Sequence, residues 1–397
     1  MALFRSEVLN HDFFKKALED AEQTRYVEVN EITIGEVSYI GLQEIIPVQI
    51  CANIRGRTKV FNWTAKLNSS SESASKLGKE LNLCEKEVYV YTVLLPNVEL
   101  ISNNLKLAVP AHPDLIHHAE TDTTSALLLT DLTLAGFEPA LANINLEINT
   151  VELLVNWLAG LHAHSYAYFQ GKSSWLGKQE NKPPAFLVDL VPLAGRSVSS
   201  EEGLVELVKL FQPPLEDYAS RLKTLFATEA YSEICRKVFG ERTDKFCTVC
   251  HGSPWMENAL IWKDDEQIRE VVFINYQQAR FSQPATDIAI LLYTSTSKEF
   301  RKEHLSRVLK TYHNTLTETL GKLGFGPDTY PFSDLFQDYQ DAMIPAIGMA
   351  VTVLPGLVRE SGDEVDSKRG DDSLGGGKFV SDKINEMMEE LIEDGLL

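Results

Sequence analysis

The opening part of the chain changes from a helical to a strand-like spacing of its apolar side chains. Between residues 11 and 22 apolar positions recur at helical spacing, and Asn10 directly before them is a good helix cap. Three strand-like runs follow at 28–35, 45–54 and 59–67, rich in β-branched residues and separated by turn residues. The pattern therefore predicts one helix followed by antiparallel strands.

A second helix interrupts these strands. Residues from about 76 to 94 have helical spacing, and Pro96 is predicted to end the helix because proline cannot continue a helical hydrogen-bond ladder. Strand-like runs return at 107–110 and 126–132. Residues 1–132 are thus predicted to form a small, mainly β lobe with one inserted helix.

The remaining residues, 133–397, are predicted to form a larger, mainly helical lobe. Thr150 is the predicted cap of its first long helix. One hairpin is expected among these helices, inside the segment 247–287, with strands at 259–262 and 269–274 joined by a charged turn. Strands gathered in one lobe and helices in the other predict an α+β fold.

Polar residues gather at the open end of this hairpin. His251-Gly252-Ser253 and Asn258 precede the first strand, and Asn275-Tyr276-Gln277 follow the second. The two ends of an antiparallel hairpin lie side by side, so we expect these polar groups to meet. Phosphoryl-transfer enzymes use such a layout to hold a catalytic base and metal ligands around the phosphates of a nucleotide.

Charge and targeting signals narrow the classes of partner. The formal net charge is −20 over 397 residues, which argues against nucleic acid and anionic membranes, because both need a basic surface. The N-terminal residues contain no apolar segment of signal-peptide length, and no apolar run reaches transmembrane length. We therefore expect a cytoplasmic protein with a small-molecule ligand.

One cysteine motif needs an interpretation of its own. Cys247-Thr-Val-Cys250-His251 matches the pattern of c-type haem attachment, but that chemistry needs export and an exposed segment. No second cysteine or histidine pair follows at the spacing of zinc ligands. Buried strand cysteines are the preferred interpretation.

The segment from Cys250 to Thr296 carries a family resemblance. It reads HGSPWMEN and, after the hairpin, FINYQQARFSQPATDIAILLYTST. This resembles the ecdysteroid-kinase-like family, a choline-kinase-like (CHK kinase-like) group of small-molecule kinases whose members read His-Gly-Asp-x-Trp-x-x-Asn and later Ile-Asp-Phe-Gln. Ser253 stands at the position of the family's catalytic-loop Asp, and Asn275 stands at that of its metal-binding Asp. The matching positions are His251, Gly252, Trp255, Asn258, Gln277, Pro284, Asp287 and Thr294-Ser295-Thr296.

The resemblance implies a two-lobed, protein-kinase-like fold of the aminoglycoside and choline kinase type, with ATP and Mg²⁺ as cofactors. It implies that Lys66 grips nucleotide phosphates and pairs with Glu87, with Glu85 as the competing partner. A purely structural ion pair between Lys66 and Glu87 is the alternative. The resemblance also implies a hinge near Asp131 beside the nucleotide, and a helix-start Asp287 that braces the catalytic loop.

The loop expected to cover the phosphates keeps little of the family pattern. The family pattern Gly-x-Asn-x-x-Ser corresponds here to residues 41–47, in which only Gly41 remains. Glu44 is predicted to place a carboxylate near the phosphates, and Pro47 removes an amide donor.

The two departures weaken the predicted chemistry. The hydroxyl of Ser253 is not basic near neutral pH, and the inherited metal ligands Asn258 and Asn275 are both neutral, whereas Mg²⁺ usually takes carboxylates. The leading hypothesis is a catalytically impaired kinase, or pseudokinase, that binds nucleotide, a small molecule or a protein partner. One alternative is an active phosphotransferase that acts on hydroxyl groups, with Glu257 as a compensating acid. The other is a scaffold with an empty cleft.

Overall fold

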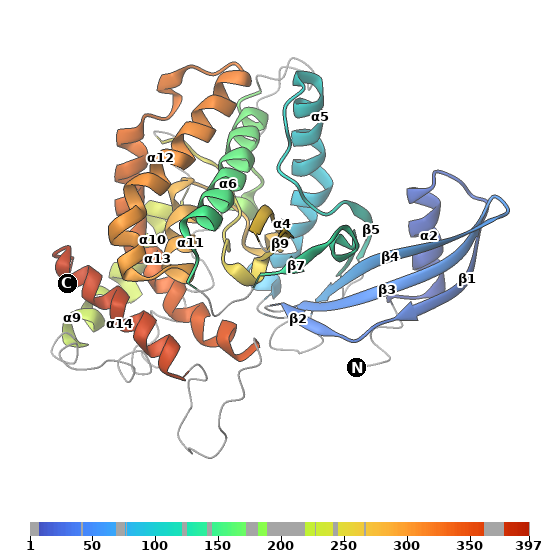
Figure 1. The fold of residues 1–397 in the computed structure, drawn as a ribbon, viewed down its shortest axis with the longest axis horizontal. Helices are drawn as coiled ribbons and strands as arrows, with labels where there is room; N and C mark the ends of the chain where they lie inside the picture. Colours follow the sequence, from blue (N-terminus) through green and yellow to red (C-terminus); the bar gives the residue numbers. More distant parts are fainter. Residues whose placement is uncertain are drawn as a thin grey trace.

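The computed structural model describes residues 8–40, 43–68, 76, 78–120, 125–140, 145–171, 182–188, 219–226, 228–240, 245–265, 267–360 and 377–396. A six-stranded sheet lies at one end of the molecule, and most of the helices gather at the other end (Figure 1). The α+β class predicted from the sequence is therefore confirmed. Among the described residues, no helix is both long enough and apolar enough to cross a lipid bilayer.

The large sheet is antiparallel throughout, in the order β1-β3-β4-β6-β5, with β2 paired to β3. The helix α2 (His11–Ala21) packs against it, and Asn10 caps this helix as predicted, because its Oδ1 accepts the N–H of Phe13 at 2.9 Å. The strands are β1 (Val27–Ile34), β2 (Ser38–Ile40), β3 (Gln43–Ile54), β4 (Arg57–Asn68), β5 (Leu115–Glu120) and β6 (Ser125–Thr130).

The two faces of this sheet have different neighbours. Trp63, Ala65 and Leu67 of β4 are buried in the core that includes α2. Because successive strand residues point to opposite faces, Lys66 points away from α2. Its partner across the ladder, Leu127, belongs to the larger core of the helical part, so Lys66 lies on the face that meets that part.

The helix between β4 and β5 does not end at Pro96, which corrects the prediction. It runs through α4 (Leu83–Tyr89), a π-helical turn η1 (Val90–Leu94) and α5 (Leu95–Leu105). Pro96 lies at the junction of η1 and α5, where the wider π turn before it accommodates the missing N–H. The apolar side of η1 and α5 packs into the larger core.

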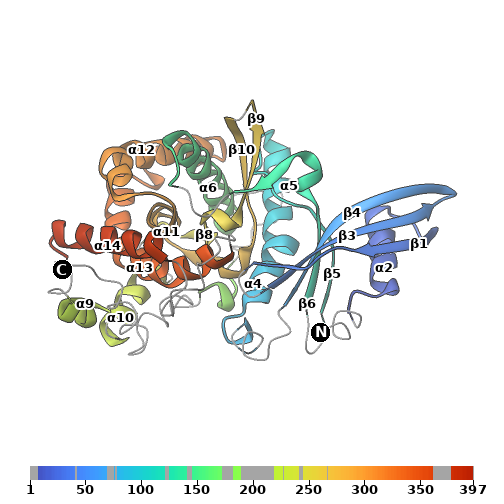
Figure 2. The ribbon, with the colours of Figure 1, turned by 60° about the horizontal axis from the view of Figure 1, so that its bottom comes forward.

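The predicted hairpin is present as β9 (Ala259–Asp264) and β10 (Gln267–Phe273), and it projects beside α5 and α6 (Figure 2). β7 (Phe137–Pro139) pairs with β9, and β8 (Thr248–Cys250) pairs with β11 (Arg280–Ser282). The helices of this part are α6 (Ile148–Phe169), α9 (Ala219–Leu225), α10 (Thr228–Phe239), α11 (Ala285–Ser295), α12 (Lys298–Lys322), α13 (Phe332–Glu360) and α14 (Gly377–Glu393).

The start of α6 differs from the prediction. Its N-cap is Glu147 and its first residue is Ile148, so Thr150 is buried inside the first turn rather than capping the helix. Burial of the apolar positions around Val151 decides this start, because they pack into the larger core.

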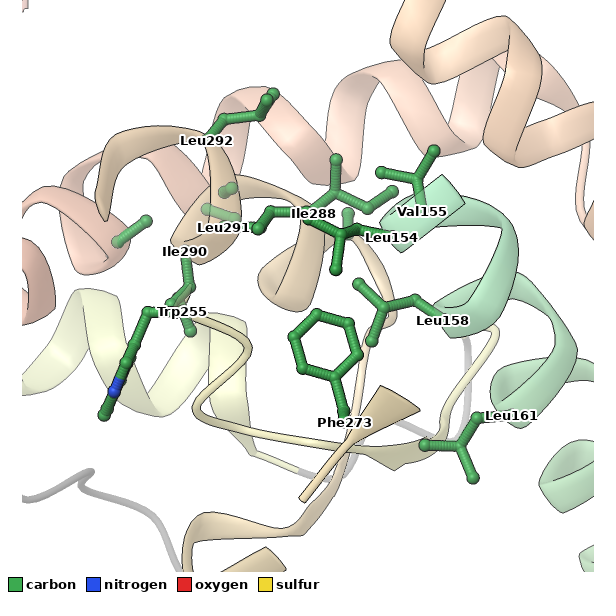
Figure 3. Close-up of a cluster of buried hydrophobic side chains, with 14 of the residues drawn as sticks. Leu154, Val155, Leu158, Leu161, Trp255, Phe273, Ile288, Ile290, Leu291 and Leu292 are labelled. Atoms are coloured by element: carbon green, nitrogen blue, oxygen red, sulfur yellow. The ribbon is translucent and has the colours of Figure 1, made fainter. Parts of the chain in front are cut away.

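The core of the helical part packs against the end of the hairpin. Leu154 and Leu158 of α6 face Phe273 at the end of β10, and Ile288 of α11 closes the same cluster (Figure 3). All four side chains are fully buried. The end of β10 is therefore packed into this core where the polar residues of the hairpin begin.

Candidate functional site

The turn after β8 is the first part of the site, and its glycine is sterically required. Gly252 has φ +83°, and a Cβ at this position would lie 1.8 Å from the backbone oxygen of Gln278. The left-handed conformation and the close approach both demand glycine. This contact brings the segment that follows Asn275 against the His251-Gly252-Ser253 turn.

Asp287 at the start of α11 fixes the same turn. Its Oδ2 accepts the backbone N–H of His251 at 2.6 Å, and its Oδ1 accepts that of Gly252 at 2.9 Å. His162 of α6 lies 3.1 Å from Oδ2 through its Nε2. Burial alone would raise the pKa of Asp287, but the hydrogen bond and charge of His162 lower it, so the carboxylate stays ionised.

His251 is held as a neutral ring. Its Nε2 bonds to the carbonyl oxygen of Ile274 at 3.0 Å, and its Nδ1 lies 3.3 Å from the backbone N–H of Ser253. A carbonyl accepts and an N–H donates, so the proton lies on Nε2 and the lone pair lies on Nδ1. Burial lowers the pKa of His251 to about 4. His251 therefore links the two polar clusters without carrying charge.

Lys66 enters the site from the sheet. Its Nζ donates to Oε1 of Glu87 at 2.5 Å and to Oδ1 of Asn275 at 2.9 Å, and both side chains of the ion pair are buried. Burial lowers the pKa of Lys66, and the neighbouring Glu87 partly opposes that shift. Glu87 also accepts the N–H of Tyr276 at 3.2 Å. Glu87, rather than Glu85, is thus the partner of Lys66, as predicted.

The two residues at the metal positions bind each other. Nδ2 of Asn275 donates to Oδ1 of Asn258 at 2.8 Å, and Nδ2 of Asn258 donates to the carbonyl oxygen of Ser253 at 2.8 Å. The orientation of both amides is forced, because Lys66 at one end can only donate and the Ser253 carbonyl at the other end can only accept. One continuous chain of hydrogen bonds therefore runs from the sheet to the catalytic loop.

This donor set does not fit Mg²⁺. The oxygens of Asn258 and Asn275 are neutral, and each already accepts a hydrogen bond from a neighbouring side chain. Mg²⁺ is normally held by one or two carboxylates together with water and phosphate. Asn275 has φ 72° and ψ 70°, a left-handed conformation that Asn and Asp both tolerate, so the backbone at this position suits either residue.

The other predicted catalytic residues lie close to this chain of hydrogen bonds. Ser253 is buried, and its hydroxyl lies 3.4 Å from the carbonyl oxygen of Asn275. Glu257 lies in the short helical turn η5 (Met256–Asn258), directly before Asn258, and is half-buried. The structure therefore brings Lys66, Glu87, Ser253, Asn258 and Asn275 together, with Glu257 beside them in the chain.

The small-lobe residues that were predicted to lie near the nucleotide have three different outcomes. Asp131 caps the short helix η2 (Leu132–Ala135), because its Oδ1 accepts the N–H of Thr133 at 2.9 Å. Gly41 lies outside the described residues. The prediction for Glu44 is wrong. Glu44 of β3 pairs with Leu67 of β4, whereas its neighbour Ile45 pairs with Lys66. Strand alternation places Glu44 on the face opposite to Lys66, where it is buried and cannot face phosphates bound beside Lys66.

The two polar partners of His162 could not be predicted from the sequence. The Nδ1 of this histidine lies 2.8 Å from the hydroxyl of Tyr312 in α12, while its Nε2 faces Asp287. A histidine on the apolar side of a helix must find polar partners when it is buried, which was the available signal. Neither partner is near His162 in sequence, so the sequence could not name them.

This chain is similar to a known protein family and to several solved structures. No curated protein matches the sequence. Among solved structures, a protein from Haemophilus somnus 129PT described as a fructosamine-3-kinase is 11% identical, with 96% of each chain covered and a TM-score of 0.40. Wild-type aminoglycoside 2'-phosphotransferase-IIIa in its GDP complex is 12% identical, with 97% of this chain and 99% of that chain covered and a TM-score of 0.38. The family model named "Ecdysteroid kinase-like family" matches residues 43–325, and this chain belongs to that family.

Proposed function

We propose that this protein is a small-molecule-binding member of its kinase family that has lost Mg²⁺-dependent phosphotransfer. The observation that carries the proposal is the chain of hydrogen bonds from Lys66 through Asn275 and Asn258 to the Ser253 carbonyl. Family membership supports a kinase-type cleft for a hydroxylated small molecule, with or without a nucleotide.

The loss of phosphotransfer follows from two missing carboxylates. The hydroxyl of Ser253 cannot accept a proton from an attacking alcohol near neutral pH. The neutral amide of Asn275 supplies no charge to hold a divalent cation against phosphate oxygens. Since positioning and charge stabilisation make up most of the catalysis of phosphoryl transfer, losing both groups should lower the rate by several orders of magnitude.

The binding role is supported by what the site retains. Lys66 and Glu87 keep their buried ion pair, and Lys66 uses two of its three N–H groups in the hydrogen bonds described above. Among the described residues the third N–H group has no acceptor, so it can donate to an anionic or hydroxyl oxygen of a ligand. Hydrogen bonds from Asp287 and His251 hold the catalytic-loop turn, and none of them depends on a metal ion.

The direct test measures nucleotide binding and turnover in the same preparation. ATP and ADP binding are titrated by calorimetry with Mg²⁺ and with a chelator, and ATP consumption is followed with a panel of hydroxylated small molecules, ecdysteroids included. We expect binding of a nucleotide or of a panel member that does not depend on Mg²⁺, and no turnover.

Two results would overturn the proposal. Robust turnover by the unmodified protein that disappears in Glu257→Gln would establish an active phosphotransferase with Glu257 as the compensating acid. Absence of binding by every nucleotide and every panel member would indicate a scaffold whose cleft has no ligand.

A further inference from the structure

A second cluster of metal-binding side chains lies outside the kinase site, beside the π turn η1. Glu99 of α5 and His112 and Asp114 of the following loop place their ligand atoms within 4.8 Å of one another. All three line a cavity of about 350 Å³ together with Tyr91 and Thr92 of η1. Its wall residue Tyr91 packs edge-on against Tyr276, so the cavity lies next to the site around Lys66 and Asn275. We propose that Glu99, His112 and Asp114 form a binding site for a divalent transition-metal ion, with Zn²⁺ as the best-fitting ion.

The orientation of His112 is the first support for this site. Its Nδ1 lies 3.1 Å from the carbonyl oxygen of Pro113, which can only accept, so the ring proton belongs on Nδ1. The lone pair of Nε2 then points toward Oε1 of Glu99, 3.2 Å away. Two acceptors at this distance need a cation between them, either a proton or a metal ion. A ligating histidine whose other nitrogen donates to a backbone carbonyl is the usual arrangement in metal sites.

The surrounding cavity is the second support. Its volume of about 350 Å³ leaves room for the water that would complete the coordination of the ion. Thr92 of the π turn and Pro96 at the start of α5 line the same cavity. Local π-helical turns of this kind recur at functional sites.

The chemistry of the three side chains selects the ion. One imidazole nitrogen and two carboxylates suit Zn²⁺, which accepts such a set in tetrahedral geometry and keeps one position for water. Mg²⁺ and Ca²⁺ prefer an all-oxygen set, which the imidazole does not provide. The Glu99 side chain is 44% exposed, so an ion can reach the cavity from solvent.

A metal ion at this position would connect the helical part to the sheet. Glu99 belongs to α5, whose apolar side packs into the larger core. Asp114 is tied to the end of β6, because its N–H donates to Oγ1 of Thr130 at 2.8 Å and its carbonyl accepts the N–H of Thr130 at 3.0 Å. Asp131, the predicted hinge residue, follows directly. The ion would therefore fasten α5 to the strand that leads into the hinge.

The test is a titration of the chelator-treated full-length protein with Zn²⁺, followed by calorimetry, and with Co²⁺, followed by visible absorption. We expect one Zn²⁺ per chain and Co²⁺ bands without the thiolate charge-transfer absorption that cysteine ligation would produce. His112→Ala should weaken Zn²⁺ binding by more than about 100-fold, since even loss of an outer partner of a ligand costs about 10–100-fold. Glu99→Gln and Asp114→Asn should each weaken it by about 10-fold or more.

The chain offers a matched control. His117 lies 3.2 Å from Asp20 and so forms the same type of histidine–carboxylate pair, but it is not part of a three-ligand cluster in the described residues. His117→Ala should leave Zn²⁺ binding unchanged. Binding that persists in His112→Ala, that responds equally to His117→Ala, or that is absent from the unmodified protein would overturn the proposal and leave an ordinary ion pair between Glu99 and His112.

Discussion

Asn275 donates its side-chain amide to Oδ1 of Asn258 at 2.8 Å, so the two residues at the predicted metal positions hold each other. In a family member with Asp at the second position, two oxygen acceptors would face one another there, and a metal ion would be needed between them. In this protein the amide N–H takes the place of that cation. The contact between Asn258 and Asn275 is therefore satisfied without a metal ion.

The first prediction concerns the Asn275→Asp variant. Without Mg²⁺ its free energy of unfolding should fall by about 1–3 kcal/mol, because the new carboxylate faces Oδ1 of Asn258 and leaves a buried acceptor unsatisfied. Attraction to Lys66 offsets little, since Glu87 already neutralises that charge. Added Mg²⁺ should restore the free energy of unfolding that the substitution removes. Urea unfolding with and without Mg²⁺ measures both effects.

Asn62→Asp is the control for this variant. The Asn62 side chain accepts a hydrogen bond from Gln49 through its oxygen, a role that a carboxylate can keep. It should show no response to Mg²⁺. If Asn275→Asp is as stable as the unmodified protein in the chelator, the proposed balance of donors and acceptors at Asn258 is wrong.

The second prediction concerns recovery of phosphotransfer. Ser253→Asp should restore little turnover, because the base returns while Asn275 still binds no metal ion. Asn275→Asp should improve Mg²⁺-dependent nucleotide binding with little turnover, because the base is still absent. Both groups act on the same reacting phosphate, so the double variant should exceed the product of the two single effects. ATP consumption by the four proteins with the acceptor panel measures this coupling, and strictly multiplicative effects would contradict it.

The parts of the site that the sequence could predict are those set by local pattern. Two apolar strands joined by a charged turn predict the hairpin of β9 and β10. Antiparallel pairing places the two ends of this hairpin side by side, which brings Ser253 and Asn275 together. The pairing of Lys66 with Glu87 depended on the family resemblance, because the two residues come from different elements. Asn10 capped its helix as predicted, since a cap needs only its own first turn.

The predictions that failed depended on contacts between distant segments. Pro96 did not end its helix, because η1 and α5 are held by packing into the larger core. Glu44 turned away from Lys66, because residues 43–47 belong to β3 and the register with β4 decides which face each side chain takes. The orientation of the two asparagine amides required Lys66 and the Ser253 carbonyl to be placed first. Such information is absent from a single sequence.

The third prediction concerns the turn between β8 and the hairpin. Gly252→Ala should strongly destabilise the protein, because its Cβ would overlap the backbone oxygen of Gln278 at 1.8 Å and its φ of +83° is strained for alanine. Gly321 near the end of α12 is the matched control, with open space around it. Gly321→Ala should stabilise the helix by about 0.5–1 kcal/mol. Thermal unfolding compares the two, and equal behaviour would contradict the close approach at Gly252.

The last prediction concerns the pH dependence of stability, which should contain a contribution from His251. Burial lowers the pKa of this ring from 6.5 to about 4, and the N–H of Ser253 that faces Nδ1 leaves no place for a second ring proton. As the pH falls below 6.5, the unfolded chain takes up a proton at this residue while the folded protein does not. The stabilising contribution of the neutral His251 ring is therefore fully present above pH 6.5 and is lost as the pH falls toward 4.

The size of this contribution separates it from other titrating groups. Between pH 7.5 and pH 5 the unmodified protein should lose about 2 kcal/mol more of its unfolding free energy than the His251→Gln variant does. Glutamine can still donate to the Ile274 carbonyl but has no group that titrates in this range. The exposed His11→Gln variant serves as the control and should follow the unmodified protein. Urea unfolding at both pH values gives the difference directly. Parallel losses in the unmodified protein and in His251→Gln would mean that His251 takes up its proton without opening the turn that Ser253 and Ile274 close around it.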